Sequence, residues 1–298
     1  MALLRSALLI GSIAVFSYNL AQLIIFFGFN IRVYNHVPGE CTAVTLGEDA
    51  MSATSFAKID DKIIFPFEDT PAGFFTYDAK NRSAHHMALD KNLKNINPSG
   101  IAVWKKRIFV VNSNAKESTV ESLTSDKANT KLTHHATIRS KKFAGLKDIA
   151  AVGKNKFFAT NEWLRTAYEY TGMDKGAIVF FDGTNVRYVD RNITSPIGLV
   201  YDERASKLFV ASHSGEAIVV YNVSERTSNY APTQILRVHV AYFGFYLDEI
   251  RIDALYTNDG ATISAAQAAI VHGNALIMGG AHNQILSCTL PPYLSFSL

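Results

Sequence analysis

A short pattern of apolar and polar residues recurs along the chain. In residues 143–163 an apolar stretch is followed by the turn Gly153, Lys154 and Asn155, and then by a second, more apolar stretch. This pattern is typical of two short β-strands joined by a tight turn. Close variants of it occupy residues 55–68, 100–113, 198–213 and 268–282.

The spacing of these units predicts the fold. They begin near Ser52, Gly100, Asp148, Gly198 and Ala265, so that successive starts lie nearly 50 residues apart three times running. Such a period indicates an all-β propeller, in which each small sheet buries its faces only against its neighbours. Five blade units are visible. The last interval is longer than the others, which predicts an insertion near residues 242–260.

The N-terminal segment follows a different pattern. Residues 7–29 carry no charge over 23 positions, long enough for a helix to cross a bilayer. The run ends in large apolar residues, whereas a cleaved signal peptide ends in small ones. We therefore favour an uncleaved transmembrane signal anchor over a cleaved signal peptide or a buried core helix. The flanking Arg5 and Arg32 do not fix its orientation.

The chain has two cysteines, Cys41 and Cys288, which bracket all the repeats. A propeller is a ring whose first and last blades must be held together, and a disulfide there would close a very long loop. In the loop-entropy model this closure stabilises the fold by about 4 to 5 kcal/mol, and it requires an oxidising compartment. Two unpaired thiols are the alternative.

Composition and glycosylation signals narrow the class of protein to which the chain can belong. With 48% hydrophobic and 18% charged residues the chain can bury a core, and its net charge of +3 gives no reason to expect a nucleic-acid partner. N-glycosylation acceptor sequences begin at Asn81, Asn192 and Asn222. With the anchor and the paired cysteines, they predict a short cytoplasmic N-terminus and a propeller in the lumen of the endoplasmic reticulum or outside the cell.

Several collinear motifs resemble those of the paraoxonase/arylesterase family. The similarity extends from about Cys41 to Leu290. It is carried by residues 97–101, 110–112, 118–121, 137–139, 146–153, 160–162 and 285–290, in the order in which the family has them. The two cysteines fall where members of the family form their ring-closing disulfide, and the retained hydrophobic N-terminus also resembles theirs.

The resemblance implies a six-bladed propeller with calcium in its central tunnel that hydrolyses aryl esters and lactones. In such a site a hard cation polarises the ester carbonyl while histidines transfer protons. Glu48 matches a calcium-binding glutamate of the family, and Asp148 matches its aspartate beside the metal. Lys147 stands where active members have an asparagine ligand, and an ammonium cannot ligate calcium. We expect Lys147 to act as a cation that replaces the metal.

Other parts of the family's site are missing. The next asparagine ligand falls at Pro196 or Ile197, and the sequence is about one blade short after Tyr221. The family's catalytic histidines are replaced by three other residues, Ser99, Ser113 and Trp163. The histidines present elsewhere, including the pairs at 85–86 and 134–135, are expected to be exposed, and those at 213 and 282 to be structural.

These losses predict that residues 38–290 form a paraoxonase-like propeller with a degraded ester-hydrolysis site and reduced or absent calcium. Residues 1–6 would be cytoplasmic, 7–29 the anchor and 291–298 a tail. By analogy with nematode paraoxonase-like membrane proteins, the chain would assist the folding or assembly of membrane proteins. The alternative is a calcium-dependent arylesterase or lactonase with a site rebuilt from Glu48, Asp49 and Asp148, with Asp248 or Glu249, and an amide oxygen of Asn112 or Asn161.

Overall fold

The chain folds as two compact units, Met1–His36 with Ala241–Asp259 and Val37–Val240 with Gly260–Leu298. Their secondary structure is taken from a computed structural model. It describes residues 2–26, 35–44, 53–67, 73–90, 93, 96–113, 117–162, 175–212, 217–223, 232–237, 246–247, 250–251, 268–280 and 284–292.

The first unit contains one long helix and a small hairpin. Helix α1 (Ala2–Phe26) is rich in Leu, Ala and Ile, most of which favour helix. Its side chains from residue 9 to residue 21 are all exposed, including those of Ile10 (67%) and Phe16 (68%). Within the described part of the chain, no helix meets the length and apolarity that a membrane crossing requires. Strands β19 (Tyr246–Leu247) and β20 (Ile250–Arg251) pair antiparallel.

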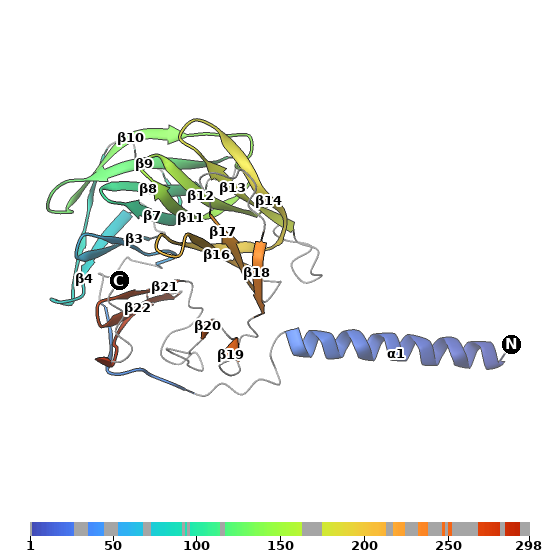
Figure 1. Cartoon of the computed structure of the whole chain (residues 1–298). Coiled ribbons are helices and arrows are strands. Elements are labelled where there is room, and N and C mark those ends of the chain that lie inside the picture. Colours follow the sequence, from blue (N-terminus) through green and yellow to red (C-terminus); the bar gives the residue numbers. More distant parts are fainter. Residues whose placement is uncertain are drawn as a thin grey trace. The chain divides into compact units, whose positions relative to one another are not determined.

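The second unit is the predicted propeller, with five blades among the described residues (Figure 1). Each blade is a meander whose first strand is innermost. The strands of the first three blades are β2 (Ala57–Ile59), β3 (Lys62–Phe67), β4 (Gly73–Asp78) and β5 (Ser83–His86) in blade 1; β7 (Pro98–Trp104), β8 (Arg107–Ser113), β9 (Ser118–Ser125) and β10 (Lys131–Ile138) in blade 2; and β11 (Leu146–Gly153), β12 (Lys156–Glu162), β13 (Lys175–Phe181) and β14 (Val186–Thr194) in blade 3. A fifth strand, β6 (Ala88–Leu89), adds to blade 2 parallel to β10.

Blade 4 consists of β15 (Pro196–Asp202), β16 (Lys207–Ser212), β17 (Ala217–Asn222) and β18 (Pro232–Arg237). Blade 5 is built from both ends of the propeller sequence, since β21 (Ala268–His272), β22 (Ala275–Gly280) and β23 (Gln284–Thr289) are completed by β1 (Cys41–Ala43). The innermost strands therefore begin within a few residues of the predicted unit starts.

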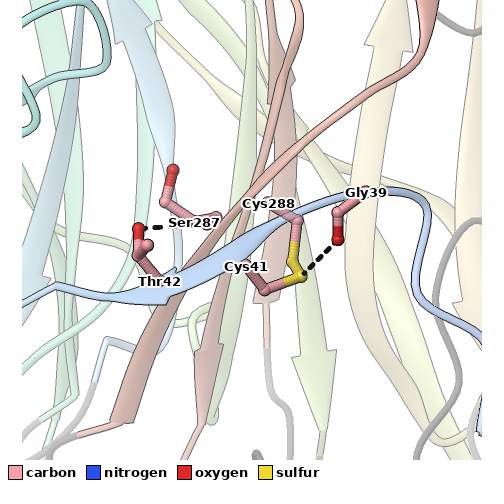
Figure 2. Close-up of a disulfide and its surroundings, with 5 residues drawn as sticks. All are labelled: Gly39, Cys41, Thr42, Ser287 and Cys288. Atoms are coloured by element: carbon pink, nitrogen blue, oxygen red, sulfur yellow. Dashed lines mark hydrogen bonds between the residues drawn. A yellow bond between two sulfur atoms is a disulfide. The ribbon is translucent and has the colours of Figure 1, made fainter.

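A disulfide joins Cys41 to Cys288 at the closure of the ring, as predicted. The two cysteines are directly opposite each other in the β1–β23 pairing. Figure 2 shows the bond between the two strands, next to the hydrogen bond that the Thr42 hydroxyl donates to the Ser287 carbonyl. The backbone N–H of Thr289 also donates to the Glu40 carbonyl at 2.9 Å. Strand β1 alone is only three residues long, so the covalent bond reinforces a short pairing.

Hydrophobic clusters fill the spaces between adjacent blades. Phe74 and Ile108 lie in the cluster between blades 1 and 2, Phe109 and Phe157 in that between blades 2 and 3, and other clusters join blades 3 and 4 and blades 5 and 1. Among the described residues, no such cluster joins blade 4 to blade 5, and Val200 on the innermost strand of blade 4 is 66% exposed.

The two faces of the ring carry different loops. The turn between the first two strands of each blade lies on one face, which we call the hairpin face. Contacts between neighbouring turns confirm that they share this face: His272 of blade 5 bonds the Asp61 carbonyl of blade 1 at 3.0 Å, and Asp60 of blade 1 pairs with Lys106 of blade 2. The opposite face, where the innermost strands begin, is called the site face.

Candidate functional site

The residues that sequence reasoning assigned to the family's site lie at the site face. Ser99 is near the start of β7, Ser113 ends β8, and Lys147 and Asp148 are near the start of β11. Because each innermost strand begins at this face and each second strand ends there, the fold brings these residues together at the site face. Glu48, Asp49, Trp163, His213, Asp248, Glu249 and His282 lie outside the described residues.

Asp148 connects several blades. One carboxylate oxygen accepts the backbone N–H of Leu199 in blade 4 at 3.1 Å, and the other accepts the hydroxyl of Ser55, just before blade 1, at 3.4 Å. Burial raises the pKa of Asp148 to about 6, although these hydrogen bonds act in the opposite direction. The fit is close: a Cβ on Gly100 of blade 2 would lie 2.7 Å from the Asp148 Cα.

The serines that replace the catalytic histidines bond the backbone of the next blade. The Ser99 hydroxyl lies 3.0 Å from the Lys147 carbonyl, the Ser113 hydroxyl lies 2.9 Å from the Leu146 carbonyl, and the two hydroxyls are 2.9 Å apart. Each hydroxyl has one hydrogen to donate, so these three contacts share two donors. Both serines therefore fasten blade 2 to blade 3.

Lys147 forms its ion pair with a different residue from those predicted. Its Nζ lies 3.6 Å from a carboxylate oxygen of Glu162, whose side chain is only 6% exposed. The hydroxyl of Ser195 donates to the other oxygen of Glu162 at 3.3 Å. The ammonium thus neutralises a buried carboxylate at the end of β12. Whether it also replaces a metal beside Glu48 stays a prediction.

The amide groups considered as calcium ligands are already engaged. The side-chain oxygen of Asn161 accepts the backbone N–H of Ala144 at 2.9 Å, and that of Asn112 accepts the backbone N–H of Asn97 at 2.9 Å. In the described part of the site face, Asp148 offers a carboxylate that could ligate a metal ion, but the neighbouring Lys147 offers an ammonium, which cannot. No group of three or more potential metal-ligating side chains occurs among the described residues, and reduced or absent calcium beside Glu48 stays a prediction.

A second polar cluster in blade 2 was missed by sequence reasoning. Glu121 on β9 is 4% exposed and accepts hydrogen bonds from Thr119 (2.8 Å), Thr137 (2.6 Å) and Asn112 (3.3 Å). Burial acts to raise the pKa of Glu121, but its hydrogen bonds outweigh burial and lower it. His134 also lies 2.9 Å from this carboxylate.

The histidine pairs had been expected at the surface. His85, His86 and His135 are exposed, but His134 has a side chain only 16% exposed, so that expectation was wrong for His134. The sequence did contain a signal for the polar cluster around Glu121. Strand alternation places Thr119 and Glu121 on the same face of β9, and Thr137 lies opposite Glu121.

A family model described as arylesterase matches residues 12–229. The chain belongs to the arylesterase family. The relatives of this chain include Mechanosensory abnormality protein 6 of Caenorhabditis elegans, 21% identical over 91% of this chain and 92% of that protein. Human serum paraoxonase/arylesterase 2 is 20% identical over 74% of this chain and 78% of its own length.

Solved structures show the same fold as this chain at low identity. A luciferin-regenerating enzyme superposes with a TM-score of 0.58 at 12% identity, covering 84% of this chain and 95% of that chain. A gluconolactonase of Xanthomonas campestris gives a TM-score of 0.53 at 12% identity, covering 87% and 98%. Both likenesses support the propeller architecture alone.

Proposed function

We propose that this chain is a membrane-anchored member of the arylesterase family that acts through protein interaction, with an ester-hydrolysis site that is degraded. The observation that carries the proposal is the bonding of Ser99 and Ser113. These side chains stand where the family has catalytic histidines, and both bond backbone carbonyls of blade 3. A hydroxyl without an adjacent base is a weak nucleophile, so the same positions serve the scaffold.

The interaction role rests on analogy and on what the chain retains. A propeller that keeps its closure and its polar contacts between blades, while its catalytic groups are replaced, is suited to presenting surfaces to other proteins. The relative from Caenorhabditis elegans covers nearly the whole chain, and its name describes a mechanosensory phenotype. We infer that the partners are membrane proteins whose folding or assembly the propeller assists.

The membrane anchor is proposed from the sequence of the N-terminal segment. The segment from residue 7 to residue 29 has no charged residue, and the described side chains from 9 to 21 are exposed along the helix. A helix that is apolar on all sides buries that surface in a membrane or in a protein core. We assign α1 to the membrane, with the propeller in the lumen of the endoplasmic reticulum or outside the cell.

The proposed location agrees with covalent features of the propeller. A disulfide at the ring closure persists in an oxidising compartment, and the acceptor residues Asn81, Asn192 and Asn222 are all exposed. Glycosylation of these residues is part of the proposal. Endoglycosidase treatment of the chain from a eukaryotic host, followed by electrophoresis, tests both the modification and the side of the membrane on which the propeller lies.

The test of the lost chemistry uses the full chain in detergent. Calcium binding is measured by calorimetry, and phenyl acetate hydrolysis is measured on the same sample. We expect no calcium-dependent turnover and no change in melting temperature on calcium chelation. Tight calcium binding with turnover would refute the proposal and favour the alternative, a calcium-dependent arylesterase or lactonase with a rebuilt site.

A further inference from the structure

Helix α1 carries polar residues at a regular spacing along one face. Ser12 and Asn19 are seven residues apart, about two helical turns, so they lie on the same side of the helix. Val15 lies between them, and this alternation of three and four residues is the spacing of a coiled-coil seam. In the sequence, Gln22 continues the same spacing. We call Ser12, Val15 and Asn19, all of them exposed, the helix seam.

Asn19 has hydrogen-bonding capacity that its own helix does not use. A side-chain N–H of Asn19 donates to the backbone carbonyl of Val15 at 2.7 Å, and this is the one hydrogen bond that its side chain makes among the described residues. An asparagine amide has two N–H donors and a carbonyl oxygen that accepts. The second N–H and the carbonyl oxygen therefore have to find their partners outside the helix.

The surroundings of Asn19 limit which groups can bond to it. Asn19 lies near the middle of the uncharged segment 7–29, which we have assigned to the membrane. The hydrocarbon core offers no water as a partner, and asparagine side chains in membrane helices form hydrogen bonds to a neighbouring helix. The side chains from residue 9 to residue 21 are all exposed, so no other described segment of the chain covers the helix seam.

Gly11 gives a second helix room to approach the helix seam. It precedes Val15 by four residues, so the two positions are neighbours on the helix surface. A Cβ added to Gly11 would meet nothing within 4 Å. Glycine inside a helix is unfavourable compared with alanine, but small residues let the backbones of two membrane helices come close together. The open surface at Gly11 and the amide of Asn19 are therefore two independent features of one helix face.

We propose that two copies of this chain associate in the membrane through the helix seam, with the two Asn19 side chains hydrogen-bonded to each other. This inference rests on the membrane anchor proposed above. All copies insert in the same direction and to the same depth, so their helices meet parallel and in register. Because an amide both donates and accepts, each Asn19 of a two-fold pair can donate to the other. This self-complementarity favours a second copy of the chain over a membrane helix of another sequence.

The test measures resonance energy transfer between full-length chains in phosphatidylcholine vesicles. Half of the chains carry a donor dye and half an acceptor dye on the N-terminal amine, and vesicles are prepared at a series of lipid-to-chain ratios to obtain the dissociation constant of the pair. We expect transfer that falls as the proportion of lipid rises. Asn19→Leu is expected to weaken the pair roughly 5- to 30-fold. Transfer no greater than that of randomly distributed chains at every ratio would overturn the proposal.

Two further variants make the test specific to the helix seam. Ser17 is also polar and exposed, but it precedes Asn19 by two residues and so lies roughly 200° around the helix. Ser17→Leu is therefore the matched control and is expected to leave the dissociation constant unchanged, whereas a weakening equal to that of Asn19→Leu would contradict a specific face. Asn19→Gln keeps the amide and is expected to retain most of the association. If Asn19→Gln weakened the pair as much as Asn19→Leu does, hydrogen bonding by the amide would be refuted.

Disulfide cross-linking locates the contact on the helix. The chain has two cysteines, and they are bonded to each other, so one added cysteine is the single free thiol. Oxidation of the vesicles is expected to give a cross-linked dimer with Val15→Cys and much less with Ser17→Cys. Cross-linking that is stronger with Ser17→Cys would place the contact on the opposite side and overturn the helix seam.

Failure of the anchor is measured separately. Alkaline carbonate extraction of the same vesicles leaves an inserted helix in the membrane fraction and releases a chain that is only bound to the surface. Release of the parent chain would overturn the anchor and this inference with it. Retention of the chain without energy transfer above the random level would overturn the pairing alone and leave the anchor in place.

Discussion

Removing the disulfide tests how the ring is closed. In the double variant Cys41→Ala with Cys288→Ala, the last blade keeps only the pairing of β1 with β23. The bond closes a loop with a sequence separation of 247 residues, which in the loop-entropy model corresponds to about 5 kcal/mol of unfolding free energy. Domains of this kind have a net stability of about 5 to 15 kcal/mol, so the variant loses a large part of it.

The assay is urea-induced unfolding followed by tryptophan fluorescence and circular dichroism. The parent chain reduced with dithiothreitol is the matched control, because it loses the bond but keeps every side chain, and it is expected to unfold with the double variant. Thiol titration of the unfolded parent verifies that the bond was formed. A loss below about 1 kcal/mol would contradict the reasoning and would mean that the β1 pairing closes the ring without covalent help.

Four further substitutions address the centre of the ring. Gly100→Ala is expected to cost about 1 to 3 kcal/mol of unfolding free energy by overpacking, whereas Gly198→Ala, whose Cβ would meet its nearest atom at 3.8 Å, is expected to be nearly neutral; thermal melts of the pair compare them. Ser99→Ala is expected to lose about 1 kcal/mol of unfolding free energy. An increase in its urea midpoint would contradict the role of the Ser99 hydroxyl in fastening blade 2 to blade 3. The pKa of Asp148 is raised from 3.8 to about 6, so in this window the folded state holds a proton that the unfolded state has lost, and stability falls as pH rises. Asp148→Asn should remove that slope; a slope that persists would assign it to another group.

The fold was predictable from the sequence to a large extent. The innermost strands of blades 2, 3 and 4 begin at Pro98, Leu146 and Pro196, each two residues before the predicted unit start. The alternation of apolar residues around a polar turn is a local property, so it can be found in a single sequence. The third and fourth strands of each blade are less regular in spacing and were not predicted individually.

The polar contacts between blades were much less predictable. Ser99 and Lys147 are 48 residues apart, and Ser55 and Asp148 are 93 apart, distances at which no local pattern carries information. The resemblance to the family indicated which positions gather at the site face, but not what the replacing residues bond. Glu162 as the partner of Lys147 emerged only from the structure.

The closure of the ring by β1 also governs when the propeller can form. Cys41 is made early in synthesis, but its partner strand β23 comes 247 residues later. At about 5 to 20 residues per second, the first strand waits on the order of 12 to 50 seconds for the strand with which it pairs. Throughout this time blade 5 is absent, one side of blade 1 is uncovered and Cys41 is a thiol without its native partner. The chain therefore depends on its compartment twice, for an oxidant and for protection of an unfinished ring during translation.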